Sequence, residues 1–253
     1  MQRLELPSFT HGNTKLPDNI MIFSLPSGFT CPGACKCLTM ANRDTGKLAH
    51  GPQQEFRCYS ALAEARFPSI RSSRWRNLDL VTGKSADQLA ELLTLSVRAQ
   101  AQRKTTHVRW FGAGDAFSAA LRDGIIAAAE HTSWLVHYLY TKNLPLWLGV
   151  DLPSNMRLTA SWGGKFDHLI EEGHFPRSAR VVTTEEEAAA LGLPIDFTDA
   201  YAYDPTPQHF AHLVHGTQTG ELQRQINARA AAGGFRGYGS RRRSASAAQP
   251  LAA

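Results

Sequence analysis

The sequence predicts an α/β fold in which a parallel sheet curls into a partial (β/α) TIM-like barrel. Strand-like and helix-like segments alternate along most of the chain, and a glycine-rich or polar loop follows nearly every strand-like segment. The composition, 43% hydrophobic and 19% charged over 253 residues, is that of a globular protein. Strands separated by helices form parallel sheets with right-handed crossovers, either open or curled into a barrel.

One strand and two helices are expected before residue 102. Residues 19–25, NIMIFSL, have the apolar and β-branched content of a buried strand. Residues 59–67 predict a helix that is broken by the proline after them. The clearest helix is expected at residues 85–101, because its leucines fall on one face and Ser85 and Gln88 have capping-box spacing.

From residue 107 onward the alternation becomes regular. The strand-like segments are short and apolar, at residues 107–112, 134–140, 157–161, 179–183 and 212–216. The loops that follow them are GAGD (112–115), TKNLP (141–145), WGGKFD (162–167), TTEEE (183–187) and GTQTG (216–220). Because the carboxyl ends of parallel strands meet at one edge of a sheet, we expect these loops and the loop after residues 19–25 to converge there.

The sequence divides into a single domain, residues 1–225, and a disordered tail rich in Arg, Gly, Ser and Ala, residues 226–253. The formal charge of +5 belongs entirely to the end of the chain, since residues before Glu221 contain equal numbers of basic and acidic side chains. A tail of this composition has too little apolar surface to fold alone. Its arginines are candidates for contact with nucleic acid or a host protein.

Four cysteines lie in the first quarter of the chain: Cys31, Cys35, Cys37 and Cys58. We expect no signal peptide, since the first residues lack a basic stretch followed by an apolar core, and no membrane span, since no apolar run is long enough; we therefore expect the reducing cytoplasm of a bacterial host. There, clustered cysteines bind metal or perform chemistry more often than they form disulfides. The CxxxCxC spacing with one later cysteine favours an iron–sulfur cluster, with a zinc site or unligated thiols as alternatives.

The GAGD loop is a candidate cofactor site. Gly112 and Gly114 let the backbone approach a ligand closely, and the Asp115 carboxylate accepts hydrogen bonds from an ammonium or hydroxyl group. The alternative is a tight turn in which Asp115 caps the next helix.

Three further residues are candidates for the substrate side of an active site: Lys142, Lys165 and His215. Each lies in or beside a loop expected at the same edge of the sheet. For His215 the alternative is a histidine satisfied within the core or a loop, because the sequence identifies no partner carboxylate. The chain has no GxSxG, P-loop or HExxH string, so it lacks the commonest hydrolase and nucleoside-triphosphatase motifs.

Several long strings are familiar: HGNTKLP, FSLPSGFTCPGACKCL, EFRCYSALAEARFPSIRSSRW, YTKNLP, LTASWGGKFDHLIEEG and HGTQ. Through them, from Ser8 to Gly220, the chain resembles an uncharacterised "phage gene product" domain of phage- and plasmid-borne proteins. The family's CPGAxxC…C pattern implies Cys31, Cys37 and Cys58 as the metal ligands and Cys35 as an extra cysteine.

More distantly, the layout is similar to that of radical S-adenosylmethionine enzymes. That resemblance implies a 4Fe-4S cluster on the three cysteines, with S-adenosylmethionine bound at Gly112, Gly114 and Asp115. The compact CxxxCxxC of those enzymes is absent here, and the third cysteine lies far downstream. The first hypothesis is therefore a cluster-binding enzyme of unknown substrate. The alternative is a non-catalytic binding protein with a structural zinc or cluster clip and an Arg-rich tail.

Overall fold

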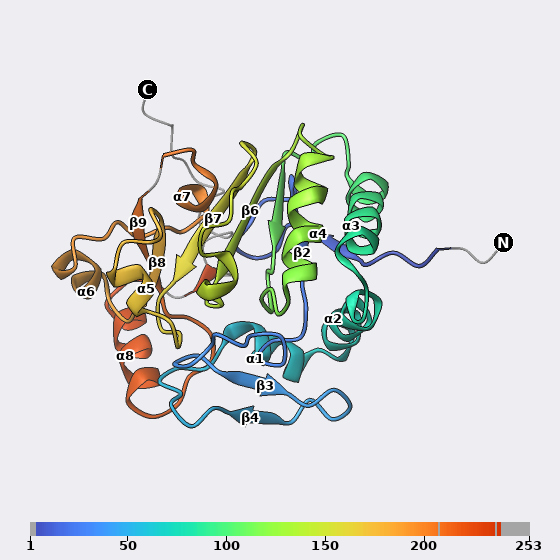
Figure 1. The fold of residues 1–253 in the computed structure, drawn as a ribbon. Helices are drawn as coiled ribbons and strands as arrows, with labels where there is room; N and C mark the ends of the chain where they lie inside the picture. The colour runs from blue at the N-terminus through green and yellow to red at the C-terminus, as the bar shows by residue number, and fades with distance from the viewer. Residues whose placement is uncertain (1–3, 207, 236, 239–253) are drawn as a thin grey trace.

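The computed structural model describes residues 4–206, 208–235 and 237–238. Their main element is a seven-stranded sheet in the order β1-β2-β5-β6-β7-β8-β9 (Figure 1). Its strands are β1 (Phe9–His11), β2 (Ile20–Phe23), β5 (His107–Trp110), β6 (Val136–Thr141), β7 (Met156–Ser161), β8 (Ser178–Val182) and β9 (His209–Leu213). β1 pairs antiparallel with β2, and every other neighbouring pair is parallel. The predicted α/β fold with a mostly parallel sheet is thus confirmed.

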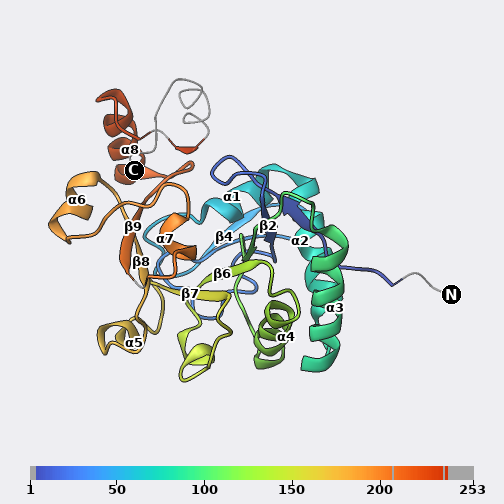
Figure 2. The same ribbon diagram turned by 90° about the horizontal axis from the view of Figure 1, so that it is seen from above.

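The sheet does not close into a barrel. β1 and β9 are its two edge strands, and they are not paired with each other in the described part of the chain. The strands follow an arc with α7 (Ala200–Tyr203) on its inner side, as Figure 2 shows. The short antiparallel strand Phe9–His11, which the sequence analysis missed, occupies the edge beside β2 where closure would need another parallel strand.

The two faces of the sheet have different coverings. Helices α3 (Ala86–Gln100) and α4 (Ala119–Glu130) pack on each other and cover one face, burying Trp110 and Leu139. The capping box predicted at the start of α3 is present. The opposite face carries a second core cluster that includes Tyr138 and Phe210 and is covered by α7.

A separate two-stranded hairpin carries the segment between the cysteines. It consists of β3 (Thr39–Ala41) and β4 (Leu48–His50), and it lies beside α1 (Tyr59–Arg66) below one edge of the sheet (Figure 1). The chain then enters α2 (Pro68–Val81) directly, with its proline in the first helical turn. Proline tolerates that position because the first N–H groups of a helix have no partner within it. The proline therefore ends α1 as predicted and also starts a helix that was not predicted.

The remaining helices are short except for the last: the 3-10 helix η1 (Leu144–Trp147), α5 (His168–Glu171), α6 (Glu185–Ala190) and α8 (Gly220–Ala231). α8 continues beyond residue 226, where the sequence predicts the tail to begin, and Phe235 and Tyr238 are buried in a small cluster with Leu213. The other residues of the predicted tail, 236 and 239–253, lie outside the described residues. The division between domain and tail at residue 225 stays a prediction.

Candidate functional site

The cysteine loop lies directly against the loop that follows β7. The Lys36 N–H donates to the Gly163 carbonyl over 3.0 Å, and the Lys165 N–H donates to the Gly33 carbonyl over 2.9 Å. Between them, Ala34 and Gly164 form an isolated antiparallel bridge. Loops separated by about 130 residues are therefore joined by backbone hydrogen bonds at one edge of the sheet, as the parallel alternation predicts.

Three of the four cysteines form an electrostatically coupled group. Burial raises the pKa of the Cys31 thiol well above its usual value, and the negative charges of Asp115, Cys58 and Cys37 add to this effect. Burial and Cys37 also raise the pKa of Cys58 to about 11, although the N–H groups of Ala61 and Ser60 oppose the shift. The structure thus brings Cys31, Cys37 and Cys58 together.

Cys35 faces elsewhere. Its Sγ donates a hydrogen bond to Gln53 Oε1 over 2.8 Å, and Cys35 is half-buried like the other three cysteines. All four cysteines are free thiols. Among the described residues, no group of three or more His, Cys, Asp or Glu side chains is arranged so that it could hold a metal ion. The three coupled thiols therefore lie near one another without the closed geometry of a metal centre.

Thr39 connects two of these cysteines through their backbone. Its side chain is fully buried, and its Oγ1 donates to the Cys37 carbonyl over 3.3 Å and accepts the Cys58 N–H over 3.2 Å. The Cys31 Sγ accepts the Gly28 N–H over 3.3 Å. Each of the three cysteines is thus held by a local contact, through the backbone for Cys37 and Cys58, even though Cys58 lies 21 residues beyond Cys37 in the sequence.

Asp115 joins the loop after β5 to the loop after β6. Its Oδ1 accepts from the Ala116 N–H and the Thr141 hydroxyl, and its Oδ2 accepts from the N–H groups of Lys142 and Asn143, over 2.8 to 3.3 Å. Burial raises the pKa of the carboxyl to about 6, against the opposing effect of these hydrogen bonds. A carboxylate offers about four acceptor positions. All of them accept hydrogen bonds from groups of the protein, so Asp115 holds the loop after β5 and the loop after β6 together.

The two glycines of GAGD are required by close packing. A side chain on Gly112 would overlap Ile22, and Gly114 has a φ of +81° and lies against Thr30 of the cysteine loop. The Gly112 carbonyl accepts hydrogen bonds from the hydroxyls of Tyr59 and Ser60, both over 3.2 Å. The GAGD loop is therefore in contact with the cysteine loop and with the start of α1.

Both candidate lysines tether loops. The Lys142 ammonium donates to Ser161 Oγ over 2.9 Å and to the carbonyls of Ser161 and Trp162. The Lys165 ammonium donates to the Pro32 carbonyl over 2.8 Å. Lys142 thus joins the loop after β6 to the end of β7 and the loop that follows it, and Lys165 joins the loop after β7 to the cysteine loop.

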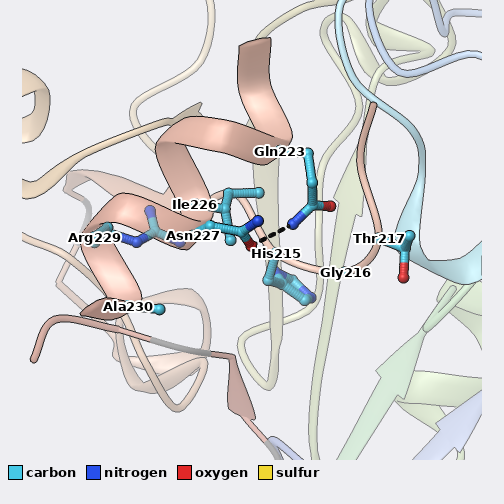
Figure 3. Close-up of a pocket in the computed structure, with 8 residues that line it drawn as sticks. All are labelled: His215, Gly216, Thr217, Gln223, Ile226, Asn227, Arg229 and Ala230. Atoms are coloured by element: carbon cyan, nitrogen blue, oxygen red, sulfur yellow. Dashed lines mark hydrogen bonds between the residues drawn. The ribbon is translucent and has the colours of Figure 1, made fainter. Parts of the chain in front are cut away.

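His215 lies beside Tyr59, the residue that follows Cys58. Its ring is 4.8 Å from the rings of both Tyr59 and Tyr238, and burial lowers its pKa to about 4. No contact among the described residues links it to either lysine. His215 also lines a cavity of about 420 Å³ beside α8, shown in Figure 3 with Gln223 and Asn227. The contacts of the described residues therefore do not join His215 to the two lysines as one catalytic group.

A buried ion cluster lies on the inner face of the sheet. Asp199, at the start of α7, pairs with Lys15 and with Arg109, whose Nη1 is 2.6 Å from Oδ2. The Tyr138 hydroxyl also donates to this carboxylate. Burial alone would raise the pKa of Asp199, but the charges of Arg109 and Lys15 outweigh burial and hold it well below its usual range.

The sequence analysis missed several of these residues. Thr39 had no signal, because its role depends on two cysteines meeting in space. Gln218, which accepts the N–H of Arg57 just before Cys58, did have a signal in the sequence, since it belongs to the HGTQ string of the family resemblance. Lys15 and Asp199 carried no local pattern that distinguishes a buried ion pair from surface charges.

A family model described as "Gene product 88" matches residues 7–235. No curated protein and no solved structure matches the chain. Among the described residues, no helix has the length and apolar content to span a membrane.

Proposed function

The chain belongs to the Gene product 88 family, and from this premise we propose that it is a phage protein that binds an iron–sulfur cluster through Cys31, Cys37 and Cys58. The observation that supports this proposal best is the separation of the four cysteines into two kinds. Burial raises the pKa of Cys31 and Cys58, and the charge of Cys37 adds to both shifts, whereas Cys35 is bonded to Gln53. The CPGAxxC…C pattern of the family likewise separates Cys31, Cys37 and Cys58 from Cys35.

The donor set fits such a cluster. Thiolates are the usual ligands of iron–sulfur clusters, and three thiolates on a four-iron cluster leave one iron open to another ligand. Burial favours the protonated thiols in the metal-free protein. Metal binding therefore has to displace protons and should become stronger as the pH rises. A bound cluster would supply electron-transfer chemistry at the edge of the sheet.

The finer proposal is a radical S-adenosylmethionine-like enzyme, of unknown substrate, on a partial (β/α) barrel. Its support is the contact between the cysteine loop and GAGD. The four internal hydrogen bonds of Asp115 argue that this residue holds the loops around a cofactor and does not receive an ammonium group. Lys165 would keep the cysteine loop in place, Lys142 would hold the neighbouring loop after β7, and His215 would lie on the substrate side.

The test is anaerobic reconstitution with iron and sulfide, followed by metal analysis and an absorption spectrum. We expect a brown protein whose iron and absorbance are lost in Cys31→Ala, Cys37→Ala and Cys58→Ala. The Cys35→Ala variant is the matched control and should retain both. Cleavage of S-adenosylmethionine by the reduced protein would support the finer proposal. Iron binding that survives each of the three single substitutions would rule out the ligand set.

A structural clip is the second candidate. The Lys36 carbonyl accepts from the N–H groups of Glu55 and Phe56, so the cysteine segments are already joined by hydrogen bonds, as in a small metal-stabilised subdomain. In this version zinc takes the place of the cluster, and the Arg-rich end of the chain contacts nucleic acid or a host protein. Stoichiometric zinc in a colourless protein, with loss of the β3–β4 region on chelation, would favour it.

A further inference from the structure

We propose that Gln218 is the positioning residue of Cys58, so that the loop after the last strand completes the thiol site. This inference rests on the proposed function, in which Cys58 is a ligand. It assigns a role to the HGTQ string, residues 215–218, that follows β9.

The Gln218 amide pairs with the backbone immediately before Cys58. Its Oε1 accepts the Arg57 N–H over 2.7 Å, and its Nε2 donates to the Arg57 carbonyl over 3.1 Å. The second Nε2 proton is donated to the carbonyl of His215 over 3.0 Å. Gln218 is only 3% exposed, so water replaces these bonds poorly. The amide therefore holds Arg57 as a neighbouring β-strand would.

The rest of the HGTQ string packs on the residue that follows Cys58. The ring of His215 lies against that of Tyr59, and Gly216 lies against the Tyr59 backbone and the side chain of Leu62. The segment from Arg57 to Tyr59 is thus held on both sides of Cys58 by one loop.

The Cys58 backbone itself is held by Thr39, which also holds Cys37. Cys58 therefore lies between two anchors, one from the cysteine hairpin and one from the loop after β9. Loss of the second anchor should displace Cys58 but leave Cys31 and Cys37 in place.

Helix α8 supports the Gln218 anchor. The Gln218 N–H donates to Gln223 Oε1 over 2.7 Å, and the Gln223 Nε2 donates to Asn227 Oδ1 over 2.8 Å. Figure 3 shows the Gln223 and Asn227 side chains joined by this bond beside His215. A chain of amides thus runs from α8 through Gln218 to Arg57.

The test is Gln218→Glu, with Gln100→Glu as a matched control. Glutamate keeps the length and the acceptor of glutamine but replaces its donors with an oxygen that repels the carbonyls of Arg57 and His215. Gln100 makes an equivalent clamp elsewhere. It accepts from the Phe9 N–H over 2.9 Å and donates to the carbonyls of Pro7 and Ser96.

The first readout is the alkylation rate of each cysteine by iodoacetamide in the metal-free protein, measured by mass spectrometry. We expect the rate at Cys58 to rise about tenfold in Gln218→Glu, the factor that corresponds to losing one buried hydrogen bond. The rates at Cys31 and Cys37 should stay unchanged, and Gln100→Glu should alter none of them. The second readout is the thiolate-to-metal absorption on titration with Co²⁺, which should weaken in Gln218→Glu alone.

Equal alkylation rates of Cys58 in Gln218→Glu and Gln100→Glu would overturn the proposal. If the wild type binds Co²⁺, equal Co²⁺ absorption in these two variants would overturn it as well. If the wild type binds no Co²⁺ but Cys58 is alkylated faster in Gln218→Glu, the positioning role is supported and the metal function is refuted. If Gln218→Glu does not fold, Gln223→Ala provides the second variant. It removes the acceptor of the Gln218 N–H and the donor to Asn227 but leaves the bonds between Gln218 and Arg57 intact, and a Cys58 rate equal to that of wild type there would also contradict the anchor.

Discussion

The Arg109 guanidinium donates to the Asp199 carboxylate over 2.6 Å on the inner face of the sheet, 90 residues apart in the sequence. Lys15 binds the same carboxylate, so the first loop, β5 and the start of α7 meet at one buried anion. Asp199 is fully buried and has a φ of +66°, a left-handed conformation that is uncommon for residues other than glycine. The ion cluster thus fixes how α7 lies against the inner face of the sheet.

Replacement of Asp199 by asparagine should destabilise the protein strongly. Asparagine tolerates the left-handed backbone, so Asp199→Asn removes the charge and leaves the cations of Lys15 and Arg109 buried together. A buried charge that loses its partner costs about 3–5 kcal/mol. Denaturant unfolding measures the loss. The control is Asp79→Asn, which breaks the Arg43 ion pair at a position where both side chains are 51% exposed and where salt and water screen the interaction. Equal losses in the two variants would contradict the structural role of Asp199.

His137 should make the free energy of unfolding depend on pH in the acid range. Burial lowers its pKa to about 4, and the neutral ring accepts from Trp110 Nε1 through Nδ1. The unfolded chain binds this proton near pH 6.5, so the stabilisation is complete above pH 6.5 and is lost as the pH falls toward 4. The slope from His137 is about 1.4 kcal/mol per pH unit.

The variant His137→Gln isolates this contribution. Unfolding free energies of variant and wild type, measured from pH 7.5 to 4.5, a range of about three units around the ordinary histidine pKa, should converge as the pH falls. The lowered pKa values of His212 and His215 also make the free energy of unfolding fall as the pH falls, and the raised pKa of Asp115 makes it rise. All three residues are present in both proteins, so their contributions cancel in the comparison. A constant difference between the two proteins would mean that His137 is not held neutral.

Replacement of Asp115 by asparagine should loosen the joined loops. The amide group of asparagine offers one acceptor oxygen, and its NH₂ would face N–H or O–H donors that now bind the carboxylate. Each buried donor left without a partner costs about 1–3 kcal/mol. We expect faster hydrogen exchange at the amides of Lys142 and Asn143, with little change in the amides of α3. Unchanged exchange at Lys142 would show that Asp115 does not hold this loop.

Much of the fold could be predicted because it depends on short-range patterns. The helix at residues 85–101 and the helix after Cys58 form where their periodicity and caps indicate. The strand predicted at residues 212–216 was misplaced: β9 runs from His209 to Leu213. Its position follows from pairing with β8, in which Ala179 faces Phe210. The antiparallel strand β1 and the β3–β4 hairpin, at three residues each, are too short for any periodic signal.

The sequence by itself determined the local elements, the order of the loops along one edge and the concentration of thiols beside them, because periodicity, capping and strand order act over short distances. Only the tertiary structure decided which thiols meet, that Asp115 binds backbone N–H groups, and that Gln218 holds the residue before Cys58. The contacts of Asp115 with the loop after β6 and of Gln218 with Arg57 join residues 26 to 161 positions apart. Such pairs form only after packing has brought the loops together, when burial makes each unpaired polar group costly.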